Sequence, residues 1–278
     1  MLKSRRVQFQ PVEIESGEPL QVHQSELLSM LPGIRHGLTM RRRDLGPGEA
    51  NVSYTAPRDQ DSAWARRKEW CTSIGVDAGS LTVPHQVHGC DVAVLTHDHR
   101  GRGAAPGSTL AGQFDAVVTS APGVTLMTTH ADCLPILMYS PDARVIASVH
   151  AGWRSTVQGV ATRTIETMIE HFSVDPAGIC AYFGPAICRD CYEVGDDVAS
   201  AWKRLDSGSG TGVLRPVGDR WRFDLVAANA QLMRERGVQL DSMERSGICT
   251  RCQGDSWFSH RGQGPLTGRF GAMISLDT

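Results

Sequence analysis

The feature that most constrains the fold is a series of short apolar runs between residues 81 and 149. The runs cover residues 92–95, 116–118, 124–127, 136–138 and 145–147, and Gly, Pro or Asp residues separate them. Short apolar runs bounded by turn-forming residues are typical of β-strands. The sequence Ser140-Pro141-Asp142 predicts a turn between the last two of them. This part of the chain is therefore predicted to be rich in β-structure.

Helices are predicted on both sides of this region. Residues 62–74 carry apolar side chains at helical spacing, and Gly75 follows as a helix stop. A second helix is expected to begin with Ser155 as its N-cap, because Gln158 three residues later completes a capping box. An apolar stripe then continues to Phe172.

The rest of the chain adds elements without a regular alternation of strand and helix. These are helices at 196–205 and 224–236 and strands at 179–183 and 268–276. Asp224 is expected to cap the second of these helices, and Gly237 to end it. Residues 1–30 are weakly patterned, with room for an edge strand. The prediction is one α+β domain of mixed sheets over residues 1–278.

The eight cysteines are interpreted through the compartment in which we expect the protein to work. No apolar segment follows the basic residues near the start of the sequence, and no window is long enough for a membrane span. We therefore expect a cytoplasmic protein with reduced thiols, which serve as metal ligands, nucleophiles or small core residues. The net charge of -2 gives no reason to expect a nucleic-acid or membrane partner.

Three segments place metal-ligand side chains where an apolar strand meets Gly or Pro. They are residues 84–89, 129–135 and 149–155, and they contain His88, Cys133 and His150. Two His and one Cys suit a catalytic zinc ion with a fourth position open, and copper accepts the same set. The alternative is that these residues are hydrogen-bonded side chains of the core.

The third segment also suggests an anion site. Gly152 and Arg154 immediately precede the helix that Ser155 is expected to cap. A helix N-terminus beside an Arg favours a bound phosphate. The alternative is an ordinary capped helix with a surface Arg.

Two Cys-x-x-Cys pairs form a separate candidate site. Cys188 and Cys191 make the first pair, and Cys249 and Cys252 make the second. In a reducing compartment this spacing is typical of a structural zinc site with four cysteine ligands. However, 57 residues separate the pairs, so four unligated thiols are the alternative.

The order of the motifs resembles the laccase-domain family, also called YfiH-like proteins, from about residue 35 to the C-terminus. The matching strings are His85-Gln86-Val87-His88-Gly89, Ala131-Asp132-Cys133-Leu134-Pro135, His150-Ala151-Gly152-Trp153-Arg154, Gly184-Pro185-Ala186-Ile187, Cys191-Tyr192-Glu193-Val194-Gly195 and Thr267-Gly268-Arg269. The resemblance implies a four-layer α/β/β/α sandwich with metal ligands at His88, Cys133 and His150. It also implies phosphorolysis of purine nucleosides (adenosine, inosine, guanosine and methylthioadenosine) and deamination of adenosine. Some bacterial members are tied to editing of peptidoglycan precursors.

One segment departs from the family pattern. Members usually carry an Arg-x-Gly-Gly-like stretch near the start, whereas this chain has Met40-Arg41-Arg42-Arg43 after His36-Gly37-Leu38-Thr39. The loop is expected near the substrate, so the substrate range of this chain stays open.

Roles can be assigned to residues beside the motifs if the substrates are a purine nucleoside and phosphate. Asp132 is the candidate general acid or base, with orientation of a ligand His as the alternative. Arg154 is expected to hold phosphate in phosphorolysis. The further candidates for substrate contact are His85, His130, Arg261 and Arg269, each with a structural role as the alternative.

Other activities predict different features. A multicopper polyphenol oxidase needs several His-x-His pairs, whereas this chain has only His97-Asp98-His99 among its ten histidines. A non-catalytic metal-binding protein would show no turnover. A thiol hydrolase would use Cys133 as a nucleophile, but a metal-bound thiolate is a poor one.

Overall fold

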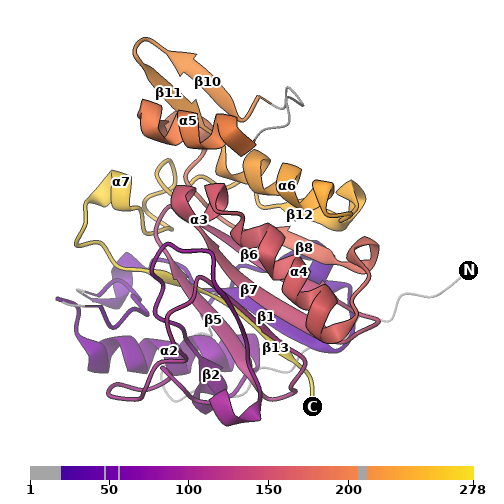
Figure 1. Cartoon of the computed structure of the whole chain (residues 1–278). Coiled ribbons are helices and arrows are strands. Elements are labelled where there is room, and N and C mark those ends of the chain that lie inside the picture. Colours follow the sequence, from indigo (N-terminus) through magenta and orange to yellow (C-terminus); the bar gives the residue numbers. More distant parts are fainter. Residues whose placement is uncertain (1–19, 47, 56, 206–211) are drawn as a thin grey trace, which may run out of the picture.

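The computed structural model describes residues 20–46, 48–55, 57–205 and 212–278. Two mixed β-sheets pack face to face, and helices cover the outer face of each (Figure 1). The predicted α+β class and the α/β/β/α layering are both confirmed. Among the described residues, no helix combines the length and apolar character needed to span a membrane.

The larger sheet has six strands and carries the main core on its helix-covered face. Its order is β12 (Met243–Arg245), β8 (Cys180–Phe183), β6 (Leu134–Ser140), β7 (Val145–Ala151), β4 (Ala116–Thr119) and β3 (Val92–Val94). Helices α3 (Trp153–Val157), α4 (Val160–Phe172) and α6 (Leu225–Glu235) lie along this face. Alternate residues of the central strands, such as Ile136 and Val149, bury their side chains beneath the helices.

The smaller sheet has four strands, in the order β1 (Ile34–Leu38), β13 (Phe270–Leu276), β5 (Thr125–His130) and β2 (Leu81–Thr82). Side chains such as Leu126 and Ile274 fill the space between the two sheets. Met127 and Met273 point to the opposite face, where they meet helix α2 (Gln60–Ile74). Successive side chains along each strand point to opposite faces of the sheet, so one strand contributes both to the core between the sheets and to the core beneath α2.

Smaller elements complete the described chain. A three-stranded antiparallel sheet joins β10 (Leu214–Val217), β11 (Arg220–Phe223) and β9 (Glu193–Val194), with helix α5 (Asp196–Leu205) packed against it. Two short helices are α1 (Glu26–Ser29) and α7 (His260–Gln263). The 3-10 helices are η1 (Arg43–Leu45), η2 (Ala78–Ser80), η3 (His97–His99), η4 (Pro176–Gly178), η5 (Arg189–Cys191) and η6 (Leu240–Ser242).

Most of the predicted elements are found, and their ends have local causes. Helix α2 begins at Gln60 because the Asp59 side chain accepts hydrogen bonds from two backbone amides of its first turn. It ends at Gly75, which adopts the left-handed conformation with φ of 82°. Asp224 caps α6 as predicted, accepting from the Ala227 amide.

The prediction that Ser155 caps a helix is wrong. Strand β7 runs on to Ala151, and Gly152 is the N-cap of the five-residue helix α3. Ser155 therefore lies inside α3, fully buried. Gly159, with φ of 80°, separates α3 from α4. The strand fixes where the chain turns, so it overrides the capping preference of Ser155.

The predicted edge strand near the N-terminus falls largely on residues 1–19, which lie outside the described residues. Between residues 20 and 30 the structure has helix α1 and a single bridge between His23 and Leu38.

Candidate metal centre

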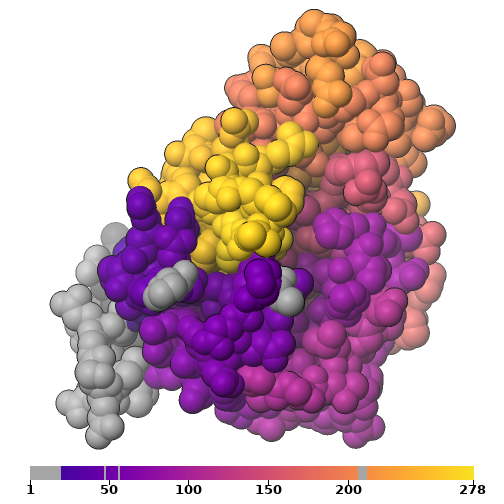
Figure 2. All heavy atoms as spheres, turned by 90° about the vertical axis from the view of Figure 1, so that its left-hand side faces the viewer, coloured from indigo at the N-terminus to yellow at the C-terminus, as the bar shows by residue number. Residues whose placement is uncertain are grey.

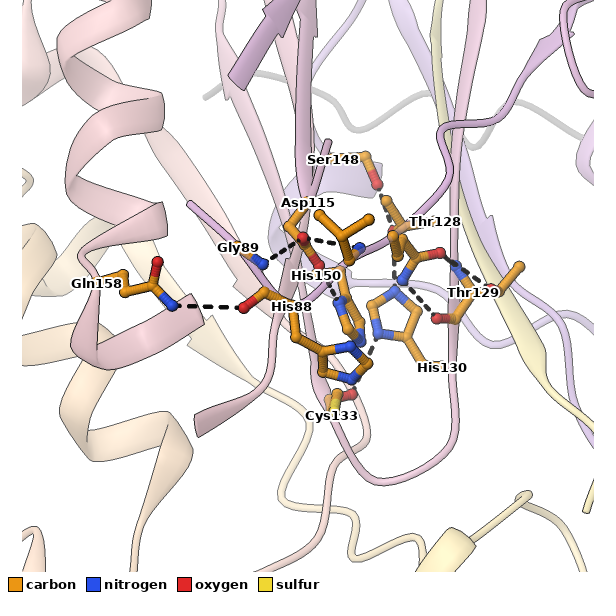
Figure 3. A network of polar contacts seen from close by, with 12 residues as sticks. His88, Gly89, Asp115, Thr128, Thr129, His130, Cys133, Ser148, His150 and Gln158 are labelled. Carbon is orange, nitrogen blue, oxygen red and sulfur yellow. Dashed lines mark hydrogen bonds and ion pairs between the residues drawn. The ribbon is translucent and has the colours of Figure 1, made fainter. Parts of the chain in front are cut away.

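His88, Cys133 and His150 come together at one end of the space between the two sheets (Figure 3). One potential ligand atom from each lies within 4.8 Å of those of the other two. His150 is at the end of β7, Cys133 is in the turn between β5 and β6, and His88 is in the loop between β2 and β3. Residues 45 and 17 positions apart along the chain thus become neighbours through strand pairing.

Two residues of the centre have an unusual backbone conformation. His88 has φ of 59°, and Asp132, immediately before Cys133, has φ of 85°. Non-glycine residues in this region cost about 1–3 kcal/mol each and cluster at functional sites. The backbone therefore adopts a costly conformation at His88 and at the residue immediately before Cys133.

Gly152 leaves room for the ligands. A Cβ atom at this position would lie 3.1 Å from Cys133 Sγ and 3.3 Å from His88 Cδ2. Both distances are tighter than ordinary van der Waals contact. The glycine that caps α3 is therefore also the residue that lets the chain pass close to the centre.

Asp115 orients the centre, and sequence analysis missed it. Its carboxylate is fully buried, and Oδ1 accepts a hydrogen bond from His150 Nδ1 at 2.7 Å. Oδ2 accepts from the backbone amides of Val87 (3.1 Å) and Gly89 (2.7 Å). One carboxylate thus fixes His150 and the loop that carries His88, and leaves His150 Nε2 free to face the other ligands. The available signal was an acidic residue directly before a buried apolar strand, where charged side chains are rare.

The charges of the centre favour a thiolate. Burial raises the pKa of Cys133, but the neighbouring His150 and His88 outweigh it and lower the pKa to about 6. Burial likewise lowers the pKa of His150, but the Cys133 thiolate and the Asp115 carboxylate outweigh it and raise the pKa to about 9. A thiolate and two imidazoles are donors that zinc and copper both accept, so this set fits either metal.

The three candidate ligands line a cavity of about 810 Å³. Its walls come from segments that are distant in sequence, around residues 53–67, 83–110, 129–154, 187–192 and 260–269. Several of these segments meet on the face shown in Figure 2, where indigo, magenta and yellow parts of the chain adjoin. Of the predicted substrate-contacting or catalytic residues, five line this cavity: His85, Asp132, Arg154, Arg261 and Arg269.

The three arginines are placed differently. Arg154 is exposed, and its guanidinium lies 4.5 Å from the Trp153 ring centroid. Arg261 donates to the Glu193 carbonyl and lies 5.1 Å from the Tyr192 ring centroid. Arg269 donates to the carbonyls of Thr267 and Gly268, and burial lowers its pKa. All three line the cavity and bring positive charge to it.

Asp132 holds the wall that carries Arg261. Oδ1 accepts from the Thr250 hydroxyl at 2.6 Å, and Oδ2 accepts from the Arg261 backbone amide at 2.7 Å. Neither bond goes to a ligand His, so the orienting role that we considered for Asp132 belongs to Asp115.

His130, which we predicted to contact substrate, lies behind the centre. Its side chain is 1% exposed and is not part of the cavity wall. Nε2 bonds to the Thr128 hydroxyl, which in turn bonds to Ser148 on the other sheet (Figure 3). The ring also stacks on Phe270, and burial holds its pKa well below the ordinary value. His130 therefore links the two sheets behind the centre.

The predicted anion site at the helix start also changes. Since α3 begins at Trp153 and has only five residues, Arg154 lies within its first turn rather than before it. The helix dipole of so short a segment is small, so anion binding in this region depends on the arginine side chains.

Two further side chains, which the sequence did not single out, support the cavity. Gln86 clamps the backbone of Thr129, donating to its carbonyl and accepting from its amide, each at 2.9 Å. Arg67 is buried beneath Tyr54, with its guanidinium 3.7 Å from the ring centroid, and donates to the carbonyl of Val52. The Gln86 contacts hold the His88 loop against β5. The Arg67 contact holds the segment at Val52 against α2.

The four other predicted ligands also meet. Cys188, Cys191, Cys249 and Cys252 form a second group whose sulfur atoms lie within 4.8 Å of one another. Within the described part of the chain, these two groups are the ones that unite three or more potential ligands in this way.

Comparison with known proteins identifies a matching family and several relatives of this chain. Residues 35–277 match the family model described as multi-copper polyphenol oxidoreductase laccase. The chain is 36% identical over 198 residues to a protein named adenosine deaminase RL5, from an unknown prokaryotic organism, covering 70% of this chain and 75% of the relative. It is 37% identical over 210 residues to a purine nucleoside phosphorylase of Deinococcus radiodurans, covering 76% of each. The crystal structure of YlmD from Geobacillus stearothermophilus superposes with a TM-score of 0.84 at 28% identity, covering 89% of this chain and 93% of YlmD.

Proposed function

This chain belongs to the multi-copper polyphenol oxidoreductase laccase family, as its motifs predicted, and from that membership we propose that it is a metal-dependent purine nucleoside phosphorylase that also deaminates adenosine. The observation that carries the proposal is the position of three metal-ligand side chains and three arginines on the wall of one cavity. The cavity volume of about 810 Å³ is in the range of sites for small ligands such as a nucleoside.

The arginines suit the phosphate that phosphorolysis consumes. Guanidinium groups bind phosphate oxygens through paired, charge-assisted hydrogen bonds. Arg154, Arg261 and Arg269 all line the cavity, so phosphate held by any of them lies beside the nucleoside. Holding both reactants in one site supplies much of the rate gain for such a reaction.

The walls also offer surfaces for the purine and the sugar. Tyr54, Trp153 and Ile187 present aromatic or apolar groups to the cavity, and His85 and Gln60 present polar ones. Aromatic side chains stack favourably on nucleobases. The mixture suits a ligand with a flat apolar base and a polar ribose.

The residues of the centre have two kinds of role, metal binding and positioning. A zinc or copper ion held by His88, Cys133 and His150 would supply a Lewis acid at the cavity wall. Asp115 orients His150 and the His88 loop. Both carboxylate oxygens of Asp132 accept hydrogen bonds, so we assign it to positioning Arg261, with proton transfer to the substrate as the alternative.

Polyphenol oxidation, the activity in the family description, has less support. A multicopper cluster needs several histidines in one place. Each of the two ligand groups among the described residues has too few: one contains two His and the other contains none. His97 and His99 lie in the short helix η3, outside both groups.

The test is to incubate the zinc-loaded protein with adenosine, with and without phosphate, and to separate the products by chromatography. Adenine that forms only with phosphate would establish phosphorolysis, and inosine that forms without phosphate would establish deamination. Cys133→Ala should abolish both activities. Cys180→Ala, a half-buried cysteine outside both ligand groups, serves as the matched control. Finding neither product would refute the purine assignment, and peptidoglycan precursors would be tested next.

A further inference from the structure

The second cysteine group lies beside residues that line the cavity, because Ile187 and Tyr192 flank its first pair. Cys188 is the N-cap and Cys191 the last residue of the short helix η5, which follows β8. Cys249 and Cys252 lie in the bridge and turn that follow β12. All four sulfur atoms lie within 4.8 Å of one another, and those of Cys191 and Cys252 are 3.4 Å apart. The fold thus closes the gap between the two pairs that the sequence left open.

Backbone pairing brings the two segments into register. Ala186 and Cys249 form a parallel bridge, in which the Ala186 amide donates to Ile248 and the Thr250 amide donates to Ala186. The amides of Cys188 and Cys252 then both point at Cys249 Sγ, at 3.3 and 3.5 Å. Backbone amides directed at a sulfur favour its thiolate form, which is the form that binds metal.

The surroundings are unlike those of ordinary core cysteines. A free cysteine usually behaves as a small buried hydrophobe. Here Cys252 is exposed, Cys188 and Cys191 are half-buried, and only Cys249 is buried. Packing therefore does not explain four thiols in one place.

We propose that Cys188, Cys191, Cys249 and Cys252 hold a structural zinc ion, separate from the centre at His88, Cys133 and His150. Four thiolates in tetrahedral array make the closed coordination shell of such sites, with Zn–S distances of about 2.3 Å and S–S distances near 3.8 Å. Sulfur atoms already within 4.8 Å of one another need only small side-chain shifts to reach that geometry. On binding, the four thiols release four protons and the site gains a net charge of minus two, which the adjacent Arg251 guanidinium partly offsets.

The zinc ion would stabilise the segments that carry part of the cavity lining. Ile187 and Tyr192 flank the first cysteine pair, and both line the cavity. Thr250, inside the second pair, donates its hydroxyl to Asp132, which also holds the Arg261 amide. The role of the wall rests on the proposed function, whereas zinc binding itself does not depend on any reaction with purines.

Metal counting on the intact protein tests the site without using activity. The protein is expressed in medium supplemented with zinc. Native mass spectrometry and elemental analysis should then find two zinc ions per wild-type chain. Cys133→Ala should retain one, and Cys133→Ala combined with Cys252→Ser should retain none. Adding Cys180→Ala to Cys133→Ala is the matched control and should leave one zinc ion bound. Cys252 is chosen because it is the exposed member of the four, and its replacement disturbs packing least.

Thiol counting on the single variant Cys133→Ala keeps the test valid if the double variant does not fold. Under native conditions the chelator-treated protein should expose four more reactive thiols than the zinc-loaded protein. A folded Cys133→Ala protein that holds no zinc would overturn the proposal. The proposal would also be overturned if the mass of the purified protein were two hydrogens below that of the reduced chain. That mass would indicate a Cys191–Cys252 disulfide in place of a zinc site. A zinc ion retained in Cys133→Ala supports the site even if no purine activity is found.

Discussion

The Asp115→Asn substitution probes the whole arrangement of the metal centre. The wild-type carboxylate accepts three hydrogen bonds, one from His150 and two from backbone amides of the His88 loop. An amide has one acceptor oxygen in place of two, so the variant can satisfy either His150 or the loop, but not both. The same change removes the negative charge that favours the His150 imidazolium in the metal-free protein.

The size of the effect follows from these contacts. Losing a hydrogen bond to a charged group costs about 1.5–3 kcal/mol, and we expect the free energy of unfolding of the metal-free protein to fall by about that amount. Replacing a residue that orients a metal-bound His typically weakens metal binding by about 10- to 100-fold. Both effects should appear together, because one carboxylate serves both parts of the centre.

The assays are denaturant unfolding of the metal-free protein and zinc titration in competition with a chelator of known affinity. Zinc is counted in the Cys252→Ser background so that the second site does not contribute. Asp98→Asn, an exposed carboxylate in η3, is the matched control and should change neither quantity. Zinc affinity within twofold of wild type in Asp115→Asn would refute the reasoning that Asp115 organises the centre.

Four further predictions concern the centre and the cavity. In the metal-free protein, alkylation of Cys133 by iodoacetamide should follow a pKa of about 6, so that the thiol reacts readily at pH 7. In the metal-free protein, the lowered pKa of Cys133 stabilises the fold more and more as pH rises from about 6 to its unfolded pKa of 9.0. The raised pKa of His150 stabilises the fold less and less as pH rises from its unfolded pKa of 6.5 to about 9. The two effects nearly cancel, so the free energy of unfolding should stay flat over this range. Gly152→Ala should weaken zinc binding by about 10- to 100-fold, the range typical of disturbed ligand support, because its Cβ would crowd Cys133 Sγ. Competition with a chelator would measure the change. Arg261→Ala should raise the phosphate KM about 10- to 150-fold, from a lost charged hydrogen bond of about 1.5–3 kcal/mol, while adenosine deamination persists.

The predictions on Cys133 alkylation, Gly152 and Arg261 each have a control and a contrary outcome. Cys71 is buried with a pKa raised to about 12, so its alkylation should be undetectable at pH 7; equal reaction at both cysteines would contradict the thiolate at Cys133. Gly178→Ala meets no atom within 4 Å and should be neutral, and equal zinc affinities in the two glycine variants would show that crowding is unimportant. Arg163→Ala, on the exposed side of α4, should leave the phosphate KM unchanged. A KM unaffected by Arg261→Ala would remove that residue from phosphate binding.

Local sequence determined most of the elements and the chemical types of the site. Helix α2 is defined by its neighbours along the chain, because Asp59 and Gly75 satisfy the backbone groups at its two ends. Short apolar runs bounded by Gly, Pro or Asp likewise predicted most strands of the two sheets. The three candidate ligands were recognisable because each lies beside Gly or Pro at the end of an apolar run. Such signals act over a few residues, and a sequence displays them directly.

Tertiary structure decided what depends on contacts between distant segments. Ser155 has the local features of an N-cap, yet the end of β7 sets the helix start at Gly152. His130 stands among the motif residues, yet the packing of the two sheets turns it inward, away from the cavity. Asp115 has no motif of its own and gains its role only because β4 and β7 are adjacent.

The two cysteine pairs illustrate the same division. Their spacing along the chain identified potential ligands, but 57 intervening residues left open whether the pairs could meet. The bridge between Ala186 and Cys249 brings them together, and that pairing is a property of the sheet. The sequence therefore determined which side chains were available for chemistry, whereas the fold decided which of them face one another, because strand order and sheet packing depend on the whole chain at once.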